Sequence, residues 1–290
     1  MFYFNPNFTP LSLNKLSQSN VNFIEQILSL LDGKMPTPTL YGWYHLLCLA
    51  LVFSLCILVF FKARNLSDKQ FNFILGGTAV LLLAFEVYKQ LNFSYTWEND
   101  TWQYQWYAFP FQFCSTPMYV MLAAVLIKNQ KIKNALYAFL GTYGLFAGSA
   151  VMFYPSTVFI ETIGINVQTM IHHGAMVVIG VFVYVSGRVK FSHKSILYAL
   201  PVFATLVLTA LGFNILYHFF GDGEQTFNMF FISPYYPCTL PVLDRIFELV
   251  PYPIFLALYF MAFSLAGYIM LLCAILVQRL EIKIKAKKLS

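Results

Sequence analysis

Charged side chains are scarce in this chain. Asp, Glu, Lys and Arg together make up only 10% of its 290 residues, whereas 59% of the residues are apolar. An ordinary soluble domain has about 25% charged residues, so this sequence lacks the polar surface that such a domain needs. The composition therefore excludes an ordinary soluble globular protein and favours a protein that lies in a membrane.

The sequence also lacks an internal repeat, a low-complexity stretch and room for a second soluble domain. Its first apolar segment begins near residue 40 and is too long for the core of a signal peptide, so we expect no cleaved leader. We expect an outer N-terminal segment over 1–38, with a short amphipathic interfacial helix within 21–31. A membrane domain follows over 39–278, and a basic cytoplasmic tail over 279–290 ends the chain.

Long apolar segments dominate what is present. A helix needs about 20 residues to cross the hydrocarbon layer of a bilayer, which is about 30 Å thick. Segments of about this length are found at 40–61, 71–93, 107–127, 134–153, 167–186, 196–220 and 254–277. The sequence therefore predicts an all-α, polytopic membrane protein with seven transmembrane helices.

Basic residues gather on one side of these segments. Of the 18 Lys and Arg residues, 14 follow the first, third, fifth or seventh segment. They are Lys62, Arg64, Lys69, Lys128, Lys131, Lys133, Arg188, Lys190, Lys194, Arg279, Lys283, Lys285, Lys287 and Lys288. The positive-inside rule then places these connections and the C-terminus in the cytoplasm and the N-terminus outside. We expect the protein to lie in the cell membrane. The net charge of +6 is explained by basic residues that face anionic lipid of the inner leaflet, so no nucleic-acid partner is expected. The sequence leaves the oligomeric state open.

Two outer connections are rich in aromatic residues. The stretch 96–107 contains three tryptophans, which is typical of an anchor at the membrane interface. The longest connection, 221–253, combines acidic residues and prolines with five aromatic residues between 227 and 236. A loop of this length is usually functional or disordered, and we expect this one to fold over the outer mouth of the bundle as a lid.

Ionisable and amide side chains gather near the outer ends of four of the segments. At about 1.5 Å of rise per residue, they all lie within roughly 10 Å of the outer boundary. They are Glu86, Cys114, His172, His173, Asn214 and His218. Polar groups inside spans are costly and often functional, so this pattern predicts one polar chamber that opens to the outer leaflet.

Cys114 has two interpretations. A thiol beside an imidazole can be deprotonated to a nucleophilic thiolate, but a free cysteine also packs as a small apolar residue. Pro110 and Pro117 favour the first interpretation, because they break the helix around the thiol and leave backbone N–H groups that can stabilise an oxyanion. Glu86 likewise either pairs with Lys89 along its own helix or orients a histidine.

Metal binding and disulfide bonding have little support in the sequence. His172 and His173 are adjacent rather than four residues apart, which is a poor arrangement for zinc, so we expect neither a metal nor a cofactor. Three other cysteines are expected to lie mid-span in apolar surroundings, and no disulfide framework is implied. These three are Cys48, Cys56 and Cys273, and the fifth cysteine, Cys238, lies in the outer loop.

Particular motifs point to a family. The sequence Phe-Pro-Phe-Gln-Phe-Cys-Ser at 109–115 and Met-Ile-His-His-Gly at 170–174 resembles the YwaF-like bacterial membrane proteins, as does Val-Pro-Tyr-Pro at 250–253. That family is distantly similar to a vertebrate membrane acyltransferase that builds polyunsaturated ether phospholipids. The resemblance covers about 40–280 and implies that Cys114 and His173 form a catalytic pair. Gln112 stands where many relatives have histidine.

Three functions are compatible with these observations. The leading hypothesis is a lipid acyltransferase, transacylase or lipid ester hydrolase that acts on membrane phospholipids. In it Cys114 attacks an ester, His173 moves the proton, and Gln112 or Asn214 helps to hold the oxyanion. His172, Glu86 and His218 then bind or orient the reacting groups. The alternative is a small-solute transporter or permease-like protein without catalysis, and the third is a seven-helix receptor or assembly factor.

Overall fold

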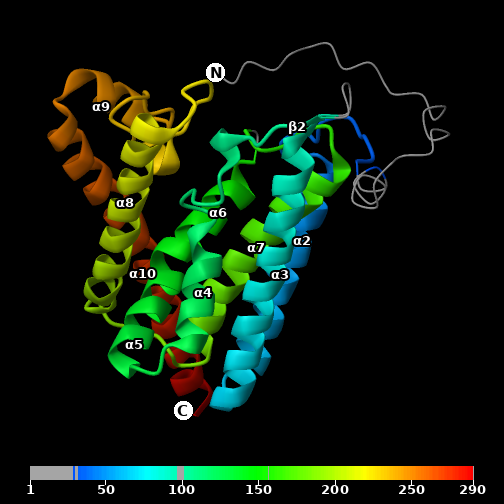
Figure 1. The fold of residues 1–290 in the computed structure, drawn as a ribbon. Helices are drawn as coiled ribbons and strands as arrows, with labels where there is room; N and C mark the ends of the chain where they lie inside the picture. Colours follow the sequence, from blue (N-terminus) through cyan, green and yellow to red (C-terminus); the bar gives the residue numbers. More distant parts are fainter. Residues whose placement is uncertain (1–28, 30–31, 97–100, 156, 290) are drawn as a thin grey trace.

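A computed structural model describes residue 29 and residues 32–96, 101–155 and 157–289 of the chain. Within this part, six helices are long and apolar enough to cross a membrane (Figure 1). They are α2 (Trp43–Lys62), α3 (Asp68–Ser94), the continuous helix Gln130–Phe153, α7 (Ile163–Val185), α8 (Ser195–Phe220) and α10 (Tyr252–Leu289). The prediction of an all-α, multi-pass membrane protein is therefore confirmed. The segment predicted as amphipathic at 21–31 lies, apart from Ser29, outside the described residues.

The third apolar segment differs from the other six. Its helix, α4 (Thr116–Leu126), has only 11 residues, which corresponds to about 16 Å of length. A 3-10 turn at Trp106–Ala108 and irregular backbone occupy the rest of the segment. Pro110 and Pro117 explain this break, because proline lacks a backbone N–H and disfavours helix in the residue before it. Pro117 is tolerated in the first turn of α4, where an N–H would have no helical partner.

Helix α7 lies at the centre of the bundle. It packs against α2, α3 and α6 (Leu145–Phe153), and α3 packs in turn against α4. Gly148 allows the close approach of α6 to α7, because a Cβ atom at this position would lie only 2.7 Å from the carbonyl oxygen of His173. The backbone around His173 is thus held directly against α6.

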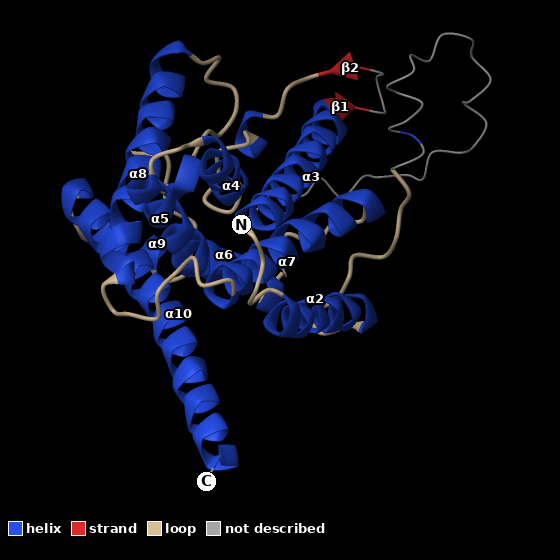
Figure 2. Cartoon of the chain, turned by 90° about the horizontal axis from the view of Figure 1, so that it is seen from below, coloured by secondary structure: helices blue, strands red, loops and turns tan. Residues whose placement is uncertain are grey.

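Helices α5 (Gln130–Phe139) and α6 are joined without a loop by a π-helical turn at Leu140–Gly144. Both α5 and α10 pack against α8, on the side of the bundle away from α2. Helix α10 is much longer than a membrane crossing requires, and its C-terminal part extends away from the other helices (Figure 2). It therefore continues into the basic tail that was predicted to begin at residue 279.

A short β-hairpin marks one end of the bundle, which we call the hairpin end. Strands β1 (Tyr95–Thr96) and β2 (Thr101–Trp102) pair antiparallel there, and the chain leads from β2 to Trp106. The indole of Trp106 contacts the rings of Tyr217 at the end of α8 and Phe227 in the following loop. The aromatic residues after β2 thus join the third segment to the loop that covers this end.

The described N-terminal residues also lie at the hairpin end. Met35 donates a backbone hydrogen bond to Glu161, and the ammonium group of Lys34 contacts Asp32 and Thr162. The opposite end carries the basic residues. There Arg188 forms an ion pair with Asp68, and Arg64 forms one with Glu281 at 2.7 Å. The two ends of the bundle therefore differ sharply in charge.

Candidate functional site

Cys114 lies in the broken part of the third segment, two residues before α4. The backbone turns tightly here, because the N–H groups of Ser115 and Thr116 both donate to the carbonyl oxygen of Gln112. The hydroxyl of Tyr119 reaches back from α4 and donates to the carbonyl of Pro110 at 2.8 Å. These bonds replace the helical ones that the prolines remove, and they hold the half-buried thiol of Cys114 at the N-terminus of α4.

His172 connects α7 to this turn. Its Nε2 lies 3.0 Å from the carbonyl oxygen of Cys114. A carbonyl oxygen only accepts hydrogen bonds, so Nε2 carries the hydrogen, and in the neutral ring Nδ1 is left with a lone pair. This Nδ1 is buried and has no hydrogen-bond partner among the described residues. The imidazole of His172 therefore fixes the backbone at Cys114 and keeps one basic nitrogen free.

His173 has the opposite tautomer. Its Nδ1 lies 2.7 Å from the carbonyl oxygen of Thr169, one helical turn earlier, so Nδ1 carries the hydrogen. Its Nε2 is buried without a hydrogen-bond partner in the described part of the chain. The centroids of the two imidazole rings lie 5.5 Å apart. Each of the two histidines thus has one ring nitrogen without a partner in the described structure, and His172 is the one that contacts the turn that carries Cys114.

The thiol itself is not hydrogen-bonded to either ring. His172 is 3% exposed and His173 is 6% exposed, and the free nitrogen of each lacks any partner, sulfur included, among the residues described. The structure thus brings Cys114 and His172 together through a backbone carbonyl. Direct transfer of a proton from the thiol to His173 requires a change of side-chain rotamer or a bridging group.

Glu86 lies on α3. We call the group of polar residues formed by Glu86, Cys114, His172 and His173 the polar layer. Its Oε1 accepts from the Lys89 ammonium at 2.7 Å and from the Gln90 amide at 2.8 Å, and this amide also donates to the carbonyl of Ala108. Its Oε2 is buried and unpartnered within the described structure. The ion pair of Glu86 with Lys89 along α3, one of the two expected roles of this carboxylate, is therefore present.

The loop 221–253 packs at the hairpin end against α8 and against the irregular segment before α4. Two amide side chains bind its backbone. Asn214 exchanges two hydrogen bonds with Met229, at 2.7 and 3.0 Å, and Gln112 accepts from the N–H of Phe230 and donates to the carbonyl of Asn228. We call residues 227–233 the plug. In this arrangement Gln112 and Asn214 both hold the plug.

Backbone strain in the plug shows why these bonds matter. Phe230 and Phe231 both have a φ of 59°, a conformation that costs about 1–3 kcal/mol for such residues. Phe230 is fully buried, stacks on Phe111 and meets the ring of Phe113 edge to face. The hydrogen bonds and these aromatic contacts together stabilise a strained turn that is bound to Gln112, two residues before Cys114.

Replacing Asn214 by leucine is expected to loosen the plug. The change leaves the N–H and the carbonyl of Met229 buried without partners, which costs about 1–3 kcal/mol. The thiol of Cys238, buried in the same loop, reports the opening. In a chain whose other four cysteines are alanine, the maleimide labelling of Cys238 is expected to accelerate about tenfold or more.

Asn134→Leu is the matched control, because Asn134 accepts only a surface hydrogen bond from Gln130 on α5. This variant is expected to leave the labelling rate of Cys238 unchanged. Equal rates for Asn214→Leu and the parent chain would show that the amide does not hold the plug.

Two titratable groups of the loop lie outside the spans. The Tyr217 hydroxyl donates to Asp222 at 2.6 Å and holds the pKa of that carboxyl below its usual value. Asp222 therefore stays ionised at neutral pH, and its contribution to stability is lost only as the pH falls through the lowered pKa. Burial raises the pKa of Cys238, so this residue is a neutral thiol near pH 7.

His218 and His45 lie apart from this layer. His218 is exposed on α8 and stacks on Tyr235 with ring centroids 3.5 Å apart. His45, near the start of α2, is fully buried: it accepts from the Tyr41 N–H and donates to the carbonyl of Met152. Both nitrogens of His45 are used, so it joins α2 to α6. Among the described residues no group of three or more His, Cys, Asp or Glu is placed to hold a metal.

Sequence reasoning missed two residues of the site. Gln90 links Glu86 to the broken segment, and its spacing of four residues from Glu86 was the available signal. Asn228 shapes the plug, because its side chain accepts from Ser233 and donates to the carbonyl of Pro237. No local spacing identifies Asn228 in advance, since an asparagine in a loop has many uses.

Comparison with known proteins finds a family match. A family model described as the TMEM164 family matches residues 40–277. No curated protein and no solved structure matches the chain. The matched range includes the broken third segment, both histidines of α7 and the plug.

Proposed function

Because this chain belongs to the TMEM164 family, a family of membrane proteins, we propose that it is a membrane-embedded lipid acyltransferase, transacylase or lipid ester hydrolase. The observation that carries the proposal is the arrangement around Cys114. The thiol lies at a helix N-terminus, its carbonyl is bound by His172, and His173 presents a free Nε2 from the next position of α7. The resemblance to YwaF-like proteins supports the same pair, Cys114 and His173.

The proposed reaction begins with the thiol. After a change of side-chain rotamer, or through a bridging group, His173 takes the proton of Cys114 at Nε2, and the thiolate attacks the carbonyl carbon of a lipid ester. The ester C–O bond breaks, the leaving alkoxide takes the proton from His173, and the acyl group remains on Cys114 as a thioester. A lipid hydroxyl or water then gives its proton to His173 and attacks the thioester. Cleavage of the C–S bond returns the proton to the sulfur.

Other residues of the layer have positioning roles in this proposal. His172 holds the backbone of Cys114, and the N-terminus of α4, with its partial positive charge, faces the developing oxyanion. Gln112 and Asn214 hold the plug over the site. Glu86 accepts hydrogen bonds from Lys89 and Gln90, and its carboxylate supplies the negative charge among these polar residues.

We further propose seven crossings, with α4 and the broken backbone before it forming the third. Irregular backbone at membrane depth is tolerated only where it is buried or lines a wet cavity, and the plug and α7 surround this stretch. The basic end then faces the cytoplasm, and the hairpin end, with the N-terminus, faces outward. Acyl-CoA is not expected on that side, so an outer-leaflet phospholipid of the cell membrane is the proposed acyl donor.

The third crossing is open to a direct test. Thr101→Cys lies in the hairpin and Lys131→Cys lies in the first turn of α5, at the opposite end of the bundle. In intact cells, a membrane-impermeant maleimide is expected to label cysteine at 101 and to leave cysteine at 131 unlabelled until the cells are lysed. Labelling of both from outside would show that α4 does not complete a crossing.

The function is tested with the purified protein in liposomes. A phospholipid with one labelled acyl chain is the donor, and an unlabelled lysophospholipid is the acceptor. Appearance of label in the acceptor indicates transfer, and appearance of free fatty acid indicates hydrolysis. If label moves to neither, while a solute is taken up into sealed vesicles, the transporter alternative replaces the proposal.

A further inference from the structure

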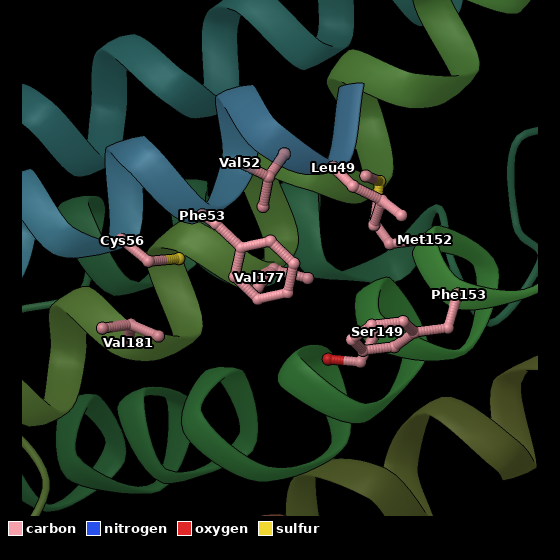
Figure 3. A pocket seen from close by; sticks show the side chains of 9 residues that line it. All are labelled: Leu49, Val52, Phe53, Cys56, Ser149, Met152, Phe153, Val177 and Val181. Atoms are coloured by element: carbon pink, nitrogen blue, oxygen red, sulfur yellow. The ribbon is translucent and has the colours of Figure 1, made fainter. Parts of the chain in front are cut away.

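An apolar pocket lies between α2, α6 and α7, next to the proposed catalytic layer (Figure 3). Its volume is about 220 Å³, and carbon and sulfur atoms form nearly all of its lining, with Ser149 as the one polar residue among those that line it. An apolar cavity of roughly 150 Å³ stays dry and binds small hydrocarbons. A pocket of this chemistry therefore accepts hydrocarbon and excludes polar solutes.

The pocket is elongated along the helices. Four of its residues, Leu49, Val52, Phe53 and Cys56, follow one face of α2 over two turns, which corresponds to about 10 Å. Figure 3 shows Cys56 at one end of this row and Leu49 at the other, with Phe53 between them. The lining thus extends over about two turns of α2, a length that suits a segment of an extended acyl chain.

One end of the pocket lies beside His173. Val177 and Val181 line it from α7, at four and eight residues after His173, and so share its helical face. At the Leu49 end, Val52 and Met152 both border Gly174, the residue after His173. A chain that lies in this pocket therefore has one end at the level of the histidine layer and the other two turns further along α7.

The pocket also opens to the surface of the membrane domain. Phe53 is 52% exposed and Phe153 is 49% exposed, and their rings lie 6.3 Å apart at its rim. Helix α2 is a candidate membrane span of which most of the surface is uncovered by the rest of the protein. In a membrane this rim is therefore surrounded by lipid, whose acyl chains are apolar like the lining of the pocket.

We propose that this pocket binds one acyl chain of a membrane phospholipid and sets the position of its ester beside His173. The last part of this inference rests on the proposed acyl-transfer function, whereas the binding of the chain does not. The pocket is smaller than the 300–1,000 Å³ of a site for a whole drug-sized ligand, so it holds part of one chain, and the rest of the lipid stays in the bilayer.

The binding is tested by photo-crosslinking with the full-length protein. Vesicles of phosphatidylcholine and phosphatidylglycerol contain a phosphatidylcholine with a diazirine near the middle of one acyl chain. After irradiation and proteolysis, crosslinks are expected on α2 or α7 residues that line the pocket. In Cys56→Trp, which fills the pocket, crosslinking there is expected to fall about tenfold, because added volume in a packed space displaces its occupant.

Leu58→Trp is the matched control, since Leu58 lies on the same helix, is 53% exposed and does not line the pocket. Crosslinking at the pocket is expected to stay unchanged in this variant. Val181→Phe fills the same space from α7 and guards against a folding defect in the first variant. Unchanged crosslinking at the pocket in both filled variants would overturn the proposal.

Because crosslinking needs no turnover, its result is separate from the outcome of the acyl-transfer assay. If the protein transfers acyl groups but the pocket is not crosslinked, the catalytic proposal stands and this inference fails. If the pocket is crosslinked in a protein without acyl-transfer activity, the chain site stands alone.

Discussion

Replacing Cys114 by alanine is expected to abolish acyl transfer, with a loss in rate of at least about 1,000-fold. The reason is that the acyl group must bond to a nucleophile between donor and acceptor, and the thiol is the nucleophile proposed at the N-terminus of α4. The rate is measured in liposomes from the transfer of a labelled acyl chain to a lysophospholipid. Labelling of the site by a thiol-reactive probe is expected to disappear in the same variant.

Cys273→Ala is the matched control for this experiment. Cys273 is exposed on α10, so its removal is expected to leave transfer unchanged. The thermal unfolding of Cys114→Ala in detergent should match that of the parent chain, because a half-buried thiol contributes little packing. Full acyl transfer by a folded Cys114→Ala protein would exclude the thiol from the reaction.

Replacing His173 by alanine is expected to lower the transfer rate about 10²- to 10⁴-fold, the usual contribution of a general base. The Nε2 of His173 is buried, neutral and without a partner in the described structure, which suits a group that receives and returns a proton. The affinity for phospholipid should change little, because the imidazole acts on the proton and not on the acyl chain. The loss is therefore expected in kcat rather than in KM.

His172 separates the positioning role from the base role. His172→Gln keeps an N–H donor within reach of the Cys114 carbonyl, whereas His172→Ala removes it. We expect His172→Gln to retain much more activity than His172→Ala. Full activity in His173→Ala, together with inactivity in both His172 variants, would contradict this assignment and make His172 the base.

Much of the fold was predictable from apolar length alone. The six long helices follow apolar segments that the sequence contains, and the break before α4 follows from Pro110 and Pro117. The helical tail after residue 277 was not expected, although its Glu, Lys, Ala and Leu residues favour helix. The sequence predicted its charge but not its conformation.

The details of the site were less predictable. The pattern of residues placed Cys114 and two histidines at similar depth, but adjacent histidines point about 100° apart, and only contacts decide which one meets the cysteine. The structure assigns that contact to His172, through a backbone carbonyl and not through the thiol. The bonds of Gln112 and Asn214 to the plug were equally hidden, because they depend on the strained turn at Phe230.

The most direct test of the account is mass spectrometry of the peptide that contains Cys114, after incubation with phospholipid vesicles in the absence of an acceptor. The account predicts an acyl adduct on Cys114 that neutral hydroxylamine removes and that a lysophospholipid acceptor discharges. Acyl transfer that proceeds without any adduct on Cys114, or with the adduct on another residue, would contradict it.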